Sequence, residues 1–159
     1  MVKYILEDIL KVRNFRKDIA EKEFTKAQRL VVEAEENVKR AESALEEYKV
    51  FIVKETDRLY KQVMNKKVKK DAVDGLNAAI KNLKNRLIDH EKAVDNEKEN
   101  LEKAKQNVEE KRQVLMEANK NIEKLSAHKE TWMKEAMRLE EEVADKELEE
   151  FTGKKVDND

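Results

Sequence analysis

The chain has 159 residues, two glycines and neither proline nor cysteine, a composition that excludes a loop-rich globular domain and all disulfide or thiol chemistry. Charged residues make up 45 % of the chain, too many to enclose in one compact core, yet the net charge is only −1 and favours neither nucleic acid nor a membrane surface as a partner. No apolar run approaches the roughly 20 residues of a membrane span, so we expect a soluble, cytoplasmic protein without membrane insertion.

The first predicted element is a long helix over about residues 4–64. Its apolar residues recur in alternating steps of three and four, the 3.5-residue repeat of supercoiled helices. Before this repeat there is an apolar stripe broader than a two-helix seam requires, formed by Ile5, Leu6, Ile9, Leu10 and Val12. The repeat itself consists of Ala20, Phe24, Ala27, Val31, Ala34, Val38, Ala41, Leu45, Tyr48, Ile52 and Leu59.

The repeat is lost at about residues 65–71, where we expect a turn. Asn65 is suited to end the first helix and Asp71 to cap the second. The surrounding segment from residue 61 to residue 70 contains five lysines and no acid: Lys61, Lys66, Lys67, Lys69 and Lys70. Two interpretations remain open for these lysines, a solvated turn and a basic docking patch.

A second helix is predicted over about residues 72–150, followed by a frayed tail at 151–159. Residues 140–159 hold nine acids against three lysines, so this end of the chain is acidic. The unbroken heptad seam of this helix, with d and a positions alternating, runs through Leu76, Ile80, Leu83, Leu87, His90, Val94, Glu97, Leu101, Ala104, Val108, Lys111, Leu115, Ala118, Ile122, Leu125, Lys129, Trp132, Ala136, Leu139 and Val143.

These elements predict an all-α fold in which two long helices form one antiparallel coiled-coil hairpin, as a monomer and a single domain. With the bend near Val68, residues whose numbers sum to about 136 should face each other. Tyr48 should then lie near His90, Tyr4 near Trp132, and Glu7 near Lys129. The alternative is a parallel dimer of one continuous helix, which the capping residues and the unequal compositions of the two seams disfavour. The helical rise gives the hairpin a length of roughly 95–120 Å.

Catalytic, cofactor-binding or metal-binding residues are not indicated. The two histidines, His90 and His128, lack ligating neighbours at helical spacing, and a two-helix hairpin has no cleft for catalytic carboxylates. Glu55, Glu97, Lys111 and Lys129, at seam positions, are interpreted as residues that fix the register of the helices. An enzyme is therefore not expected. An apolar docking surface is predicted instead at the end that carries both termini, from Trp132, Met133, Met137, Ile5 and Ile9.

The segment from His128 to Ala136, HKETWMKEA, resembles a stretch of the chlamydial members of the YscO/FliJ family of type III secretion proteins. The opening residues Met1 to Tyr4, the following Leu6, Glu7 and Leu10, and the helix break past residue 64 are similar to the same family. The resemblance extends over essentially the whole chain, although only the segment around Trp132 is specific.

This resemblance implies a stalk of the type III secretion export apparatus, located peripherally at its base. Such a stalk inserts the end with both termini into the hexameric secretion ATPase, and also contacts the export gate and the chaperones of secreted translocator proteins. The alternative function is a generic coiled-coil tether without an ATPase partner. A stalk needs two different ends, and the basic turn and the acidic, aromatic-bearing end favour it.

Overall fold

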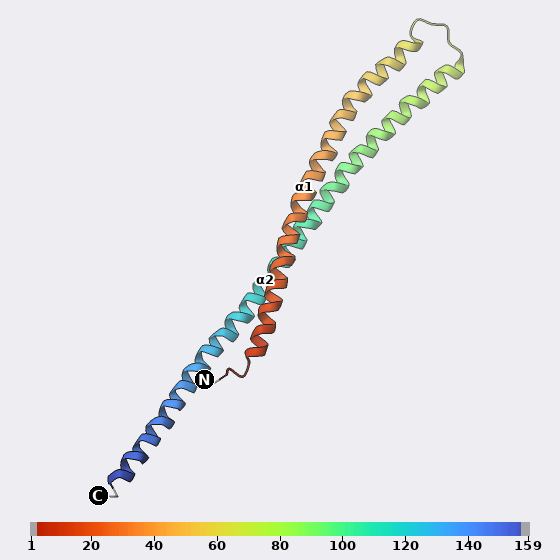
Figure 1. Cartoon of the computed structure of the whole chain (residues 1–159). Helices are drawn as coiled ribbons and strands as arrows, with labels where there is room; N and C mark the ends of the chain where they lie inside the picture. The colour runs from red at the N-terminus through yellow and green to blue at the C-terminus, as the bar shows by residue number, and fades with distance from the viewer. Residues whose placement is uncertain (1–2, 157–159) are drawn as a thin grey trace. The chain divides into compact units, whose positions relative to one another are not determined.

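Two long helices joined by a short loop make up the fold, which was analysed in a computed structural model (Figure 1). The structure describes residues 3–156 and the side chains of residues 3–153. Helix α1 spans Glu7–Val63 and helix α2 spans Lys70–Val156. The predicted all-α helical hairpin is thereby confirmed. Within the described part of the chain, no helix is both long enough and apolar enough to cross a membrane.

The contacts between the helices divide the chain into two units. The first unit combines residues 1–24 with residues 111–159, and the second consists of residues 25–110. Each unit pairs a stretch of α1 with a stretch of α2 that runs in the opposite direction, so each has its own section of the seam.

The second unit contains the loop between the helices. Asn65 adopts a φ of 60°, the left-handed conformation that commonly ends a helix, as the sequence predicts. The second helix begins at Lys70, where the amides of Ala72 and Val73 point to the carbonyl of Lys69. Asp71 therefore lies in the first turn of α2 and does not cap it, a small correction to the sequence prediction. Its carboxylate still suits the positive end of the helix dipole.

Small side chains of α1 pack against larger ones of α2 in this unit. Ala27, Ala34 and Val38 are buried on α1, and Leu83 and Val94 are buried on α2. Alanine lets the two backbones approach closely, so a narrow seam excludes water without a globular core.

The predicted pair of Tyr48 and His90 is confirmed in the second unit. The two rings lie 4.7 Å apart between centroids, and the Tyr48 hydroxyl donates a hydrogen bond of 2.8 Å to the Leu83 carbonyl. The seam histidine thus packs on an aromatic ring, as the sequence analysis expects.

The first unit is held together by buried apolar residues and by ion pairs across the seam. Leu10, Ala20 and Leu125 are buried. Lys129 Nζ lies 2.8 Å from a carboxylate oxygen of Glu7, and Lys111 Nζ lies 3.4 Å from Glu23. Both lysines thus form ion pairs across the seam, at positions where the sequence predicts residues that fix the register. Glu55 does not, because its carboxylate binds Arg58 of its own helix at 2.6 Å.

The seam of α2 is covered over a shorter length than the heptad pattern predicts. Each predicted seam residue from Leu76 to Ala136 is buried or half-buried, whereas Leu139 and Val143 are exposed. The reason is that α1 begins at Glu7, so its residues do not extend along α2 beyond the region of Trp132. Helix α2 itself continues to Val156, six residues beyond the predicted end at 150, and residues 157–159 of the predicted tail lie outside the described residues.

Candidate docking surfaces

Trp132 forms part of an aromatic anchor that holds the N-terminal segment on α2. Tyr4, which precedes α1, is only 3 % exposed and meets the Trp132 ring edge-on with centroids 5.3 Å apart. Its hydroxyl lies 2.5 Å from Nδ1 of His128, one helical turn before Trp132. Lys129 Nζ lies 5.9 Å from the centre of the Tyr4 ring, a cation–π distance. Trp132 is therefore half-buried and primarily structural.

The other four residues of the predicted apolar surface are exposed beside this anchor. Ile5 follows Tyr4 in the chain and is 74 % exposed, and Ile9 on the first turns of α1 is 45 % exposed. On α2, Met133 and Met137 are 38 % and 58 % exposed. The structure thus brings the aromatic anchor and four exposed apolar side chains to the same end of the first unit.

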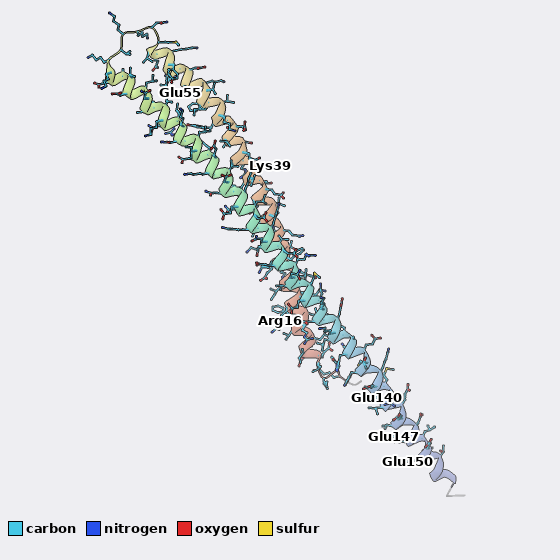
Figure 2. The ribbon with its side chains drawn as sticks, turned by 180° about the vertical axis from the view of Figure 1, so that it is seen from behind. Arg16, Lys39, Glu55, Glu140, Glu147 and Glu150 are labelled. Atoms are coloured by element: carbon cyan, nitrogen blue, oxygen red, sulfur yellow. The ribbon has the colours of Figure 1, made fainter. Side chains whose placement is uncertain are left out.

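The apolar surface continues further along α1 than the sequence analysis recognised. Val12, Phe15 and Ile19 are also exposed, and Phe15 is 66 % exposed. The spacing of Ile9, Val12 and Ile19 places them on one face of α1, so the signal was present as a second, interrupted heptad stripe. Its interruption falls at Arg16, labelled in Figure 2.

A shallow groove of the first unit runs between this part of α1 and α2. Arg13 lies in it and donates a hydrogen bond of 3.0 Å to the Asn121 carbonyl, a contact that occupies one of its guanidinium nitrogens. The groove is lined by Arg13, Arg16, Ala20, Val114, Glu117, Ala118 and Asn121. The groove is open to solvent, so it lacks the enclosure of a small-molecule site, and its lining contains both positively and negatively charged side chains.

The five lysines near the loop are all exposed. Lys61 lies in the last turn of α1 and Lys70 begins α2, while the other three lie in the loop between the helices. The structure therefore brings together a basic cluster of solvated side chains, consisting of Lys61, Lys66, Lys67, Lys69 and Lys70. Exposure alone does not choose between a solvated turn and a docking patch.

The end of α2 differs from the rest of the helix in charge and in exposure. In Figure 2, Glu140, Glu147 and Glu150 lie on a stretch of α2 that has no second helix beside it. Leu139 and Val143 on the same stretch are 53 % and 56 % exposed. This stretch thus combines an acidic surface with uncovered seam positions.

Little in the described residues supports chemistry at these surfaces. They contain no group of three or more histidines, cysteines or acids that could hold a metal ion. The hydrogen bond from Arg58 lowers the pKa of the Glu55 carboxyl, and the same contact raises the pKa of Arg58. Arg58 is exposed and Glu55 is half-buried at the helix surface, so this perturbation reflects a local ion pair and does not mark a catalytic site.

Comparison with known proteins gives a family match over most of the chain. Residues 6–154 match the family model for type III secretion protein YscO. Among curated proteins there is no match.

Two solved structures are similar along almost their whole length. A proposed YscO homologue from Chlamydia trachomatis, CT670, is 31 % identical with a TM-score of 0.74, and the match covers 95 % of this chain and 93 % of that one. Type III secretion protein YscO from Vibrio parahaemolyticus is 23 % identical with a TM-score of 0.88, and the match covers 92 % of both chains. The second likeness supports the fold alone, because its identity is low.

Proposed function

Because the chain belongs to the YscO family of type III secretion proteins, we propose that it is a stalk of the export apparatus that docks into the hexameric secretion ATPase. The first unit, with both chain ends, makes the ATPase contact. The protein further couples the ATPase to the export gate and to the chaperones of secreted translocators, at the base of the apparatus.

The observation that carries the ATPase contact is the apolar surface beside the aromatic anchor. A helix pair that only spaces two partners needs no exposed apolar side chains beyond its seam. Here Ile5 and Met137 are more than half exposed, next to the rigid Tyr4–Trp132 contact. Methionine adapts its shape to irregular partner surfaces, and the anchor fixes the backbone from which these side chains project. An apolar sleeve inside an ATPase ring is a suitable acceptor for such a surface.

The basic cluster supports the second contact. Its lysines are exposed and lie where the chain reverses, so they are sterically accessible to a partner with acidic groups. We assign this cluster to the export gate or to a chaperone, with a binding strength that decreases as the salt concentration rises.

The direct test measures ATP hydrolysis by the secretion ATPase of the same source with and without the purified protein. We expect the wild type to bind and to raise the rate, and the double variant Met133→Glu, Met137→Glu to do neither while keeping its helix content. The matched control is Val53→Glu, which places the same charge on an aliphatic residue of the second unit that is 62 % exposed. Normal stimulation by the double variant would place the contact elsewhere, and a wild type that does not bind would favour the tether.

A further inference from the structure

The seam of α2 continues beyond the part that α1 covers. We call residues 137–153 the C-terminal arm. On the arm, Leu139 and Val143 occupy the same heptad positions as the buried Leu125 and the half-buried Ala136, yet both are more than half exposed. Leu139 and Val143 also line a shallow groove together with Glu140, Ala144 and Glu147. Leucine and valine at d and a favour pairing with another helix, so the arm is a continuation of an existing interface without its partner.

The charge beside the seam changes where the cover of α1 ends. In a coiled coil, the e and g positions flank the seam and determine which partner is accepted. Of the sixteen e and g positions from Asn77 to His128, only Glu91 is acidic. From residue 135 to residue 149, the e and g positions on both sides of the seam are all glutamate: Glu135, Glu140, Glu142, Glu147 and Glu149.

These two observations identify the occupant by its chemistry. We propose that the C-terminal arm is a docking site for a basic amphipathic helix of a partner protein, with aliphatic residues at its a and d positions and lysine or arginine at e and g. A second arm is a poor occupant, because glutamates would face glutamates across the seam. The seam contains Lys146 and Glu150 after Val143, so the partner's apolar stretch is short.

The proposal is independent of the ATPase contact assigned to Ile5, Ile9, Met133 and Met137. It concerns the seam positions beyond Ala136 and the glutamates beside them, whereas Met137, although within the arm, lies at the outward b position. Arg138 already lies 3.2 Å from Glu142, which partly neutralises one of the five glutamates. The charge that selects the partner therefore resides mainly on the others, of which Glu140 and Glu147 are both at e.

The test uses two designed three-heptad peptides with valine at a and leucine at d. One has lysine and the other glutamate at all e and g positions, and binding to the full chain is measured by fluorescence anisotropy at low and at high salt. We expect the lysine peptide to bind with one-to-one stoichiometry and at least tenfold more tightly than the glutamate peptide, with the difference reduced by salt. The double variant Glu140→Lys, Glu147→Lys should weaken binding of the lysine peptide and strengthen binding of the glutamate peptide.

Matched variants separate the seam from general attraction to an acidic helix. Val143→Glu should lower the affinity for the lysine peptide at least tenfold. Leu148→Glu should leave that affinity unchanged, because Leu148 occupies the outward f position and is 67 % exposed. Equal binding of the two peptides, equal effects of the two variants, or absence of binding would each overturn the proposal. Dimers of the chain whose formation Val143→Glu abolishes would overturn it as well, because the occupant would then be a second copy.

Discussion

Tyr4 attaches the segment before α1 to helix α2. It precedes α1, yet it is one of the least exposed side chains, and its ring and hydroxyl contact two different residues of α2. Among the described residues of the segment before α1, Lys3 and Ile5 are exposed, with Ile5 at 74 %, and Leu6 is half-buried. The position of Ile5 within the apolar docking surface thus depends mainly on the Tyr4 side chain.

We predict that Tyr4→Phe lowers the free energy of unfolding by about 1 kcal/mol, because it removes one hydrogen bond but keeps the ring against Trp132. Tyr4→Ala should release the segment altogether. Trp132 is the only tryptophan, so its fluorescence reports this contact directly. The emission should keep its wavelength in Tyr4→Phe and shift to longer wavelengths in Tyr4→Ala.

A matched control is Tyr60→Phe, which removes the same hydroxyl from a tyrosine of the second unit that is 47 % exposed. It should leave both stability and Trp132 emission unchanged. If Tyr4→Ala has the wild-type spectrum, then the aromatic anchor does not hold the segment in solution.

At the residue scale, the sequence predicts contacts that follow from the register of the two helices. It misses cases in which a side chain binds a neighbour on its own helix. The pairs Tyr4–Trp132, Tyr48–His90 and Glu7–Lys129 were all predicted by one number, the position of the bend. Glu55 instead binds Arg58, because a basic residue three positions away on the same helix is an equally accessible partner. Heptad position alone does not decide whether a charged side chain binds across the seam or on its own helix.

At the element scale, Gly75 is a weakness near the start of α2. It lies within the helix, and a β-carbon added there would meet no atom within 4 Å. Nothing in the described structure therefore requires a glycine at this position. The residue raises the local cost of forming the helix next to the loop.

We predict that Gly75→Ala stabilises the start of α2 by about 0.5–1 kcal/mol, the difference in helix propensity between the two residues. Amide hydrogen exchange of the first turns of α2 should slow accordingly. Ala78→Gly, at an exposed position of the same helix, should have the opposite effect. Destabilisation by Gly75→Ala would mean that the glycine serves a contact absent from the isolated chain.

The basic cluster around the loop gives a second prediction at this scale. Reversal of Lys66, Lys67 and Lys69 to glutamate should weaken binding to the export gate or the chaperone, with a smaller salt dependence, and should leave helix content unchanged. A suitable control reverses three exposed lysines far from the loop in sequence: Lys22, Lys26 and Lys39. Unaltered binding and secretion after the loop reversal would identify the cluster as an ordinary solvated turn.

The two long helices and the break between them were predictable from the sequence, and the extent of their pairing was not. The heptad pattern correctly predicts that α2 is helical through Val143, but a pattern on one helix cannot say where the helix paired with it ends. The exposure of Leu139 and Val143 was therefore not predicted. The break at Asn65 was predictable because asparagine tolerates a positive φ, here 60°.

For the whole molecule, we propose different partners for different parts of one chain: the ATPase for the aromatic anchor with its apolar surface, a basic helix for the C-terminal arm, and a further partner for the basic cluster. The chain is expected to act as a monomer of 18.8 kDa, because each helix already has its partner over most of its seam. The central claim among these is the ATPase contact.

Hydrogen exchange of the protein alone and in complex with the hexameric ATPase tests that claim most directly. We predict slower exchange in the complex for peptides covering residues 4–10 and 130–137, where Ile5, Ile9, Met133 and Met137 lie, and unchanged exchange for residues 61–70. Protection confined to residues 61–70, or absent from the first unit, would contradict the account.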